Sequence, residues 1–218
     1  MKKIYITIAL LFGISTLASA QEVTYGVKAG VTVSDWRGDA SEGISDLVDL
    51  TGVVSTRPNV GFHVGGFAVI PLKAGFTLEP GVIYNQKGMH LSETLVDMIV
   101  PITAKAVVKS HYIDLPVMAK FQAPGGFQIF GGPQVSYLVA NRLKTKAGIL
   151  GLNVQENFKI DAGFRKVDVA LAGGIGYQFA NGTNISASYE HGLSSIDENG
   201  FFDAYNRAFK ATVGIALP

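Results

Sequence analysis

The residues best suited to covalent chemistry lie close together near position 190. Glu190, His191, Ser194 and Ser195 could form a hydrolase site, in which a carboxylate orients a histidine base that activates a serine nucleophile. Adjacent residues of a β-strand point to opposite faces, so Glu190 and His191 cannot act together without a bulge. We therefore predict no catalytic residue and keep a lipid hydrolase or acyltransferase only as a third hypothesis.

Metal and nucleotide chemistry find little support in the sequence. His63, His90 and His111 lie in separate segments without metal-ligand spacing, and the chain contains no cysteine. Gly174 and Gly176, like the glycines of the other strands, lack the strand-turn-helix context of a phosphate-binding loop. We predict neither a metal nor a cofactor.

The charge balance bears on the class of partner. The chain contains 18 Lys and Arg residues against 17 Asp and Glu residues, a net charge of +1. A nucleic-acid-binding protein would show a strongly basic domain or stripe. We therefore predict no nucleic-acid partner.

The first twenty residues predict export. Two lysines precede the apolar run Ile4 to Leu17, and an Ala-Ser-Ala cleavage site ends at Ala20. The run is shorter than the ~20 apolar residues of a membrane-spanning helix. We predict that residues 1–20 are a cleaved signal peptide and that residues 21–218 form one exported domain.

Apolar and polar residues alternate with a period of two in eight segments, which predicts eight β-strands. Connections between them are alternately short and long, and Asn181-Gly182 is a hairpin signal within a short one. This arrangement predicts an all-β fold, an eight-stranded antiparallel up-and-down transmembrane β-barrel with short periplasmic turns and long extracellular loops. The predicted strands are 24–34, 60–70, 76–87, 112–121, 127–138, 167–179, 184–193 and 205–217, and the predicted long loops are 35–59, 88–111, 139–166 and 194–204.

Aromatic residues on the apolar face distinguish a membrane barrel from a soluble one, whose apolar face would point inward. They form two rows, about 20–25 Å apart at ~3.3 Å per residue and a ~40° tilt, as expected of girdles around a ~25 Å lipid-facing band. The row at the short-turn rim comprises Tyr25, Phe76, Phe121, Phe127 and Phe179, and the row towards the long loops comprises Tyr84, Tyr137 and Tyr189.

The opposite face collects charged residues among many Gly, Ala and Ser residues. An eight-stranded barrel has an interior only wide enough for side chains, so we predict a structural salt-bridge cluster rather than a transport path. The predicted lumenal cluster comprises Lys28, His63, Glu79, Asp114, Lys120, Asp168, Glu190 and Lys210. Pro80, Pro116 and Pro133 also lie within predicted strands, where we expect bulges or irregular pairing because proline lacks a ladder donor.

The long loops are predicted to carry the specificity. Loop 35–59 holds Trp36 and an acidic stretch, which is interpreted as a solvated loop rather than a calcium or partner site. The apolar segment Leu95 to Val108 either extends its flanking strands above the membrane or covers the barrel mouth. We predict a monomer that contacts outer-membrane lipids and, through loops 35–59 and 88–111, a surface protein, glycan or lipid.

Four motifs in order resemble a known family. The chain is similar to the outer-membrane β-barrel domain family common in Bacteroidetes, often labelled porin family or PorT-like. This resemblance implies an eight-stranded barrel of mostly unassigned function and supplies no catalytic residues. The motifs are YIDLPVMAKF at 112–121, LEPGVIYNQKG at 78–88, GGPQVSYLVA at 131–140 and VDVALAGGIGYQF at 167–179. The chain departs from many outer-membrane barrels by ending in Leu217-Pro218 instead of an aromatic residue.

Three functions follow in order of preference. The first is a structural or interaction role, exerted through extracellular loops on a barrel with a filled lumen. The second is porin-like transport of a small solute or apolar ligand, and the third is the lipid enzyme. Charge pairing across the lumen would favour the first, an unpaired lumenal row the second, and a contact among histidine, serine and a carboxylate the third.

Overall fold

The computed structural model describes residues 23–38, 54–95, 102–149, 152–159, 163–198 and 203–217. The predicted signal peptide and the acidic part of loop 35–59 beyond Gly38 lie outside these ranges. Within them, no helix is long and apolar enough to cross a membrane. The strands are β1 (Thr24–Arg37), β2 (Val54–Pro71), β3 (Phe76–Leu95), β4 (Ile102–Gln122), β5 (Phe127–Ile149), β6 (Leu152–Lys159), β7 (Val167–Gln178), β8 (Thr183–Gly192) and β9 (Tyr205–Leu217).

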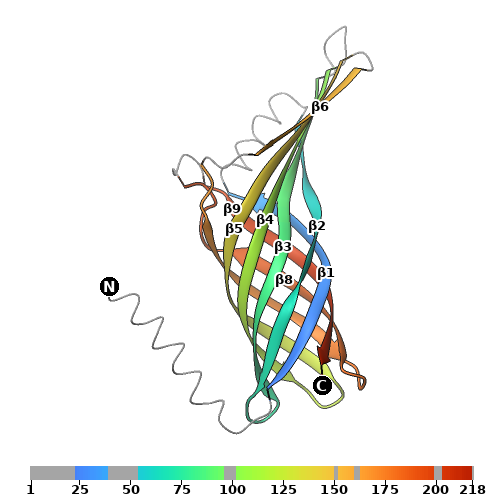
Figure 1. Ribbon diagram of the computed structural model, residues 1–218, viewed down its shortest axis with the longest axis vertical. Coiled ribbons are helices and arrows are strands. Elements are labelled where there is room, and N and C mark those ends of the chain that lie inside the picture. Colours follow the sequence, from blue (N-terminus) through green and yellow to red (C-terminus); the bar gives the residue numbers. More distant parts are fainter. Residues whose placement is uncertain are drawn as a thin grey trace, which may run out of the picture.

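Eight of these strands close into an antiparallel barrel. Neighbours in the chain pair with each other, β5 pairs with β7, and β1 pairs with β9 to complete the ring. Strand β6 pairs only with β5 in the part of the chain that is described, so it is not a barrel strand. Tyr25 pairs with Leu217, which places both ends of the barrel at one rim (Figure 1). The predicted fold is confirmed.

The barrel is apolar outside and polar inside. On β1, Val31 is 49% exposed while its neighbour Thr32 is fully buried. On β4, Leu115 is 47% exposed while Asp114 is fully buried. This inversion of a soluble protein's core suits a surface that contacts lipid, because burial of polar groups in the lumen supplies their hydrogen bonds. The soluble alternative is excluded.

Tight turns form one rim, at residues 72–75, 123–126 and 179–182. In the last of these, Gly182 adopts a φ of 83°, which glycine tolerates because it lacks a Cβ. The side chain of Asn181 accepts a hydrogen bond from the Thr183 amide at 3.1 Å. The Asn-Gly pair therefore forms the predicted hairpin.

At the opposite rim, the structure differs from the sequence-based expectation. Strands β3, β4 and β5 are 20, 21 and 23 residues long, whereas β7 and β8 have 12 and 10. Figure 1 shows β3, β4 and β5 rising beyond the other strands towards β6. We call this raised sheet the extension; it comprises residues 54–58, 88–95, 102–111, 140–149 and 152–159.

The extension corrects two predicted loops. Residues 88–111 and 139–166 are predicted as long loops, but β3 and β4 stay paired up to Leu95 and Ile102, and β5 and β6 pair from Ile149 and Leu152. Residues 54–59 of loop 35–59 also belong to β2. Of the two alternatives for Leu95 to Val108, extension of the strands is therefore confirmed for the described residues; residues 96–101 lie outside them.

The prolines interrupt the ladders without changing the register. The β3–β4 ladder lacks pairs between Pro80 and Ile83, and the β4–β5 ladder lacks them between Pro116 and Ala119. The register is the same on both sides of each gap, so the predicted irregular pairing is confirmed and the predicted bulges are wrong. Register shifts occur elsewhere, between Pro58 and His63 and between His111 and Tyr112.

Candidate functional site in the barrel lumen

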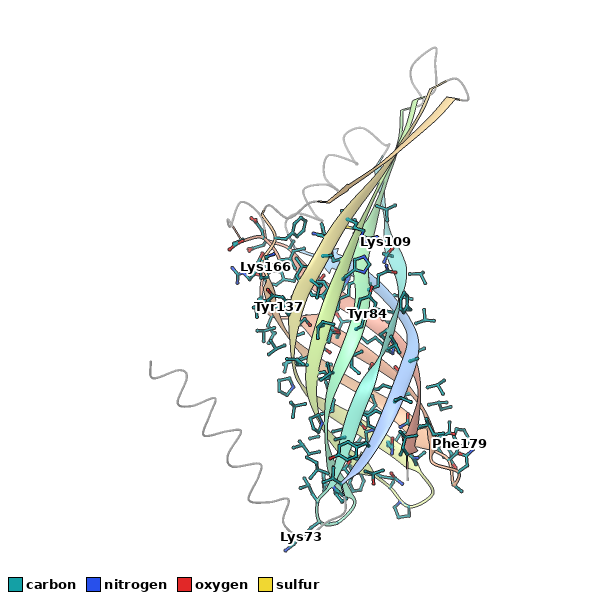
Figure 2. All side chains as sticks on the ribbon, in the orientation of Figure 1. Lys73, Tyr84, Lys109, Tyr137, Lys166 and Phe179 are labelled. Atoms are coloured by element: carbon teal, nitrogen blue, oxygen red, sulfur yellow. The ribbon has the colours of Figure 1, made fainter. Side chains whose placement is uncertain are left out.

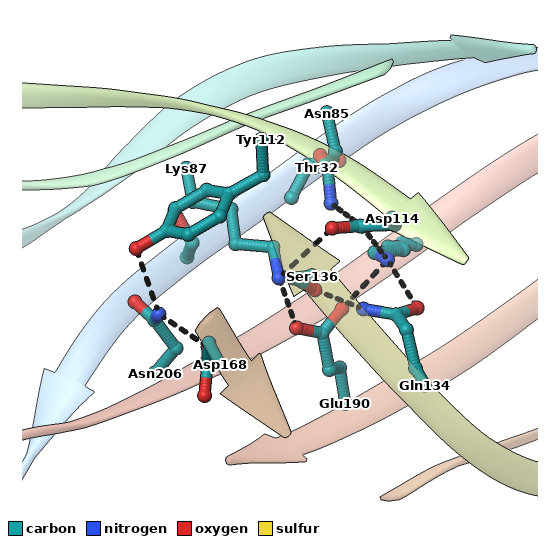
Figure 3. Close-up of polar contacts among 12 residues, drawn as sticks. Thr32, Asn85, Lys87, Tyr112, Asp114, Gln134, Ser136, Asp168, Glu190 and Asn206 are labelled. Carbon is teal, nitrogen blue, oxygen red and sulfur yellow. Dashed lines mark hydrogen bonds and ion pairs between the residues drawn. The ribbon is translucent and has the colours of Figure 1, made fainter. Parts of the chain in front are cut away.

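The centre of the lumen is occupied by two lysines and two carboxylates from four strands. Lys87 of β3 binds Glu190 of β8 and lies 3.6 Å from Asp114 of β4. Lys210 of β9 binds the other Glu190 oxygen at 2.6 Å and Asp114 at 3.3 Å. Figure 3 shows Lys87, Asp114 and Glu190 pointing toward one another across the barrel. We call this group the central cluster.

The central cluster is electrically neutral and almost fully buried. The side chains of Lys87, Asp114 and Glu190 are at most 1% exposed, and that of Lys210 is 12% exposed. Buried charges are tolerated when partners and hydrogen bonds replace water. The ring of Tyr112 adds to this environment, since its centroid lies 5.0 Å from the Lys87 ammonium.

A chain of neutral side chains extends the central cluster across β1, β2, β3 and β9. Asn85 donates to Asp114 at 2.7 Å and accepts from Thr32 at 2.9 Å. His63 then bridges two threonines. Its Nδ1 lies 3.0 Å from the Thr32 hydroxyl, and its Nε2 lies 3.0 Å from the Thr212 hydroxyl. His63 therefore lies in a hydrogen-bond network, and the described residues contain no group of His, Asp and Glu that could hold a metal.

Asp168 forms a separate site towards the extension. It accepts hydrogen bonds from Asn206 at 2.8 Å and from Ser194 at 2.7 Å. Asn206 also donates to the Tyr112 hydroxyl at 3.4 Å, as Figure 3 shows. These bonds connect Asp168 of β7 to β4 and β9.

Three residues of the third hypothesis, Glu190, His191 and Ser194, have separate partners. Glu190 faces the lumen and binds lysines, while His191 contacts Arg37 and Tyr189. Ser194 donates to Asp168, so this serine meets a carboxylate but not a histidine among the contacts of the described residues. Among the contacts of the described residues, Ser194 therefore has no histidine base beside it that would activate it.

A second ion-pair cluster lies nearer the short-turn rim. Glu79 of β3 binds Lys28 of β1 at 2.8 Å and Lys120 of β4 at 2.5 Å. We call these three residues the lower cluster. The ammonium of Lys28 lies 5.1 Å from the ring centroid of Phe67, which is buried in the lumen. Together, the two clusters and the Asp168 and His63 sites contain all eight residues of the predicted lumenal cluster.

Little open space remains between the two clusters. A cavity of about 70 Å³ has Glu79 and Lys120 on one side and Lys210 on the other. A water needs roughly 10–15 Å³ by such a measure, so the cavity has room for a few waters. Inward-facing glycines make the tight packing possible: a Cβ built on Gly174 would lie 2.2 Å from the Ala187 carbonyl oxygen.

Several lumenal residues were missing from the predicted cluster. Lys87, Asn85, Tyr112 and Asn206 are all buried and bind the charged residues. The signal for Lys87 and Asn85 was present in the sequence, because both share the parity of Glu79 along one strand. Asn206 carried a weaker signal, since it lies near the end of its strand.

The predicted girdle residues differ in exposure. Tyr25, Phe76, Phe127, Phe179 and Tyr137 are between 43% and 64% exposed. The other three predicted girdle residues are half-buried by aromatic neighbours, with ring pairs Phe76–Phe121, Phe62–Tyr84 and Tyr189–Phe209. Figure 2 shows Tyr84 and Tyr137 towards the extension and Phe179 at the opposite rim.

The rim opposite the tight turns carries contacts of residues that were predicted to lie in a loop. Asp35 belongs to β1 and forms a two-point ion pair with Arg207 of β9. Trp36 packs against Phe164 with ring centroids 6.0 Å apart. These two residues of the predicted loop 35–59 therefore belong to the rim of the barrel.

Comparison with known proteins gives distant structural neighbours and one family. Ail of Yersinia pestis, solved with the heparin analogue sucrose octasulfate, is 15% identical over 90% of this chain and 100% of its own, with a TM-score of 0.47. Neisserial surface protein A is 11% identical over 89% of this chain and 99% of its own, with a TM-score of 0.43. The outer membrane protease OmpT of Escherichia coli is 8% identical over 91% and 98%, with a TM-score of 0.30. No curated protein matches the chain.

The family comparison covers most of the chain. Residues 18–198 match the outer membrane protein beta-barrel domain. The match agrees with the closed barrel, its apolar exterior and its polar lumen. The chain therefore belongs to the outer membrane protein beta-barrel domain family and resides in the cell outer membrane.

Proposed function

We propose that this protein is a monomeric, non-conducting barrel that presents its extracellular part to partners at the cell surface. The observation that supports the proposal is the central cluster. In it, Lys87 of β3 binds Glu190 of β8, a strand on the opposite side of the barrel. Residues 1–20 act as the export signal in this proposal. We also propose, on the resemblance of the four motifs, that the protein belongs to the Bacteroidetes-type, PorT-like branch of the family.

The interaction role is supported by the paired strands that continue beyond the barrel. Strands β3, β4 and β5 continue well beyond the barrel, and β6 exists only in the extension. A barrel that served only to seal the lumen would not require this paired structure outside the membrane. Segments on the surface that a rigid scaffold holds in place are common sites of binding.

The lumenal residues act as a structural network in this proposal. Each of the four lumenal lysines contacts a carboxylate: Lys28 and Lys120 contact Glu79, and Lys87 and Lys210 contact Asp114 and Glu190. A transport path for ions would leave charges available to the solute. The two aromatic rows act as girdles that hold this filled barrel at a fixed depth in the bilayer.

Single-channel recording in planar bilayers tests the proposal. Refolding is first verified by the shift in gel mobility between heated and unheated samples. We expect no reproducible open steps from the verified barrel, because the lumen is filled. Reproducible steps would overturn the proposal and favour porin-like transport, and Lys28, Glu79 and Lys120 would then be the first residues to neutralise.

A variant with smaller side chains in the lumen is the control for the absence of channel steps in the wild type. Lys87→Ala combined with Glu190→Ala removes two large side chains from the centre of the lumen. If this variant refolds and opens small channels while the wild type stays silent, the central cluster is the plug. Channels of equal size in both proteins would show that ions pass elsewhere.

A further inference from the structure

A groove opens on the outer surface of β1, β9, β8 and β7, which are neighbours in the ring. Three residues with little or no side chain, Gly173, Ala187 and Ala211, lie at its centre. Ala187 pairs directly with Ala211, so two short side chains lie next to each other on adjacent strands. We call this hollow the outer groove; its volume is about 480 Å³. The larger residues that surround its centre are Val31, Val33, Ile175, Tyr189 and Phe209.

The outer groove faces the acyl chains of the bilayer. Ile175 and Phe209 at its sides are 54% and 63% exposed, on the barrel face opposite the lumen. Tyr189 belongs to the aromatic row towards the long loops, and its ring packs on that of Phe209 with centroids 4.8 Å apart. Ala187 and Ala211 lie two residues below this aromatic pair. The outer groove therefore lies in the outer half of the bilayer, directly below the headgroups.

A chain of hydrogen bonds begins at the upper end of the outer groove. Arg37 Nη2 lies 3.2 Å from His191 Nε2, and His191 Nδ1 lies 3.4 Å from the Tyr189 hydroxyl. A guanidinium can only donate, so His191 accepts at Nε2 and donates from Nδ1 to the Tyr189 oxygen. The Tyr189 hydroxyl then keeps its own proton for a further acceptor, and Arg37 uses only part of its N–H groups in this chain.

Arg207 brings a second guanidinium to the same place. It pairs with His191 of β8, and its Nε and Nη2 bind both carboxylate oxygens of Asp35. Its Nη1 takes no part in that ion pair. Arg37 contacts His191 and the ring of Tyr205, whose centroid lies 5.5 Å from the guanidinium carbon. We define the donor group as Arg37, Tyr189, His191 and Arg207; the N–H and O–H groups that these contacts do not use are suited to an anion.

The donor group lies at the height of the lipid headgroups. His191 and Arg207 are two residues beyond Tyr189 and Phe209, or about 5 Å above them at ~3.3 Å per residue and a ~40° tilt. Arg37 lies two residues higher, but its guanidinium reaches back to His191. The polar layer on each side of the hydrocarbon core is about 5–8 Å thick, so the donor group lies within it.

A further carboxylate lies above the donor group. Asp203 is two residues beyond Tyr205, and it accepts a hydrogen bond from the Tyr205 hydroxyl at 3.4 Å. It therefore lies on the side of the donor group that points away from the membrane, whereas the outer groove lies on the other side.

We propose that β1, β8 and β9 bind one outer-leaflet lipid that carries a phosphate group. The phosphate accepts from Arg37, Arg207 and the Tyr189 hydroxyl, and an acyl chain of the same lipid fills the outer groove. Ala187 lies four residues below His191, which is about 10 Å along the barrel axis, so one lipid spans both parts.

The choice of a lipid rests on the combination of the two parts. An apolar groove within the bilayer lies directly below a group of anion donors, and basic sites next to the membrane bind lipid headgroups. A free phosphate would use only the donor group. The inference goes beyond the proposed function, because this site lies on the membrane-facing surface and not in the extracellular part.

The test measures retention of lipid A by the refolded protein in phosphatidylcholine nanodiscs, with diphosphorylated and dephosphorylated lipid A compared. The donor variant, Arg37→Gln with Tyr189→Phe, removes one charge and one hydroxyl and leaves the ion pair of Arg207 intact. Its matched control, Arg165→Gln with Tyr137→Phe, makes the same changes at exposed residues outside the site. Every protein is first checked for the folded gel mobility.

A second pair of variants tests the outer groove. The groove variant, Ala187→Leu with Ala211→Leu, fills the groove with apolar side chains that the lipid-facing surface tolerates. Its matched control, Ala29→Leu with Ala119→Leu, makes the same changes at exposed alanines that do not line the groove.

The two variants should differ in which lipid they lose. We expect the donor variant to retain diphosphorylated lipid A about tenfold less strongly than the wild type, because charge-assisted hydrogen bonds to phosphate are lost. Retention of dephosphorylated lipid A should change little. We expect the groove variant to lose about threefold or more for both forms, because leucine side chains occupy the place of the acyl chain. Both controls should retain the lipid as the wild type does.

Several results would overturn the inference. One is equal retention of both lipid forms by the wild type, and another is a loss in either control as large as in its matched variant. Unchanged retention by the groove variant would mean that phosphate binds without the acyl chain. A shift from dimer to monomer in the groove variant, seen by gel filtration in detergent, would mean that a second copy of the chain occupies the groove.

The lipid site and the proposed function fail separately. Channel steps from the wild type would contradict the non-conducting barrel whatever the lipid result. Unchanged lipid retention in the donor variant of a silent barrel would contradict only the lipid site. The nanodisc comparison and the bilayer recording therefore use the same refolded preparation.

Discussion

The lumen and the extension place their charges in opposite ways. In the central cluster, Lys87 and Lys210 are each in contact with Glu190 and Asp114. In the extension, Lys105 pairs with another lysine, and the acidic residues are on the other face. The same strands, β4 and β5, pass through both regions, so the difference lies in the surroundings and not in the type of element.

The difference follows from the cost of removing charge from water. In the lumen, an unpaired charge loses several kcal/mol of hydration, so pairing is a condition for folding. Above the membrane, water and salt screen the charges, and like-charge neighbours cost only tenths of a kcal/mol to about 1 kcal/mol. Charge pairing is therefore required for structure in the lumen, whereas the solvent-exposed extension can carry charges of one sign on one face without a large loss of stability.

The largest expected effect comes from breaking the central cluster. Glu190→Gln leaves Lys87 and Lys210 with only Asp114 between them. We expect the free energy of unfolding to fall by about 3–5 kcal/mol, the usual effect of leaving one partner of a buried pair uncompensated. Urea unfolding of the refolded barrel, followed by gel mobility and tryptophan fluorescence, measures this.

A double variant distinguishes charge from packing. Lys87→Met with Glu190→Met keeps the volume and removes one charge of each sign, so we expect it to recover much of the lost stability. If the double variant is as unstable as the single one, packing and not charge balance explains the effect.

A smaller effect is expected from overfilling the lumen. Gly174→Ala places a Cβ within 2.8 Å of both the Phe130 ring and the Ser188 Cα. We expect a loss of about 1–3 kcal/mol in unfolding free energy, as for overpacked cores. The adjacent Gly173→Ala is the matched control, because its nearest contact would be 3.5 Å away on the lipid side. Equal losses in the two variants would mean that the lumen is not tightly filled.

The lower cluster should be less sensitive than the central one. Glu79→Gln leaves Lys28 and Lys120 without their shared carboxylate, but their side chains are 18% and 11% exposed and can reach water. We expect a loss of about 1–2 kcal/mol, smaller than for Glu190→Gln. The same urea titration compares the two variants, and an equal or larger loss at Glu79 would contradict the ranking by burial.

The transmembrane part of the fold was predictable because lipid imposes a strict rule. Every lipid-facing position between the girdles must be apolar, so the period of two is clear around Val31, Leu115 and Ile175. The lumenal partners were harder to predict, since alternation gives the face of Lys87 and Glu190 but not their register across the barrel. Their contact joins residues 103 apart in sequence.

The extension was predicted only as one of two alternatives for Leu95 to Val108, because water imposes no such rule. Residues 102–108 place Ile, Ala and Val on one face, but Val107 stands among lysines on the other, so alternation is blurred. One signal was nevertheless present: Arg142, Lys144 and Lys146 are spaced by two. The near-zero net charge gives no sign of this run of basic residues, because acids elsewhere in the chain balance it.

The smallest expected effect is a gain in the free energy of unfolding. It tests the comparison between the lumen and the extension most directly. The triple variant Lys105→Gln, Lys144→Gln, Lys146→Gln removes three positive charges. The lower cluster likewise contains three charged residues. In nanodiscs without anionic lipid, we expect unfolding to be unchanged or stabilised by up to about 1 kcal/mol, since like-charge pairs across β4, β5 and β6 are relieved. Titration at low and high salt should show the gain only at low salt, because salt already screens the exposed charges. A loss of more than 1 kcal/mol would mean that these lysines are paired within the folded protein, and the comparison between the lumen and the extension would then not hold.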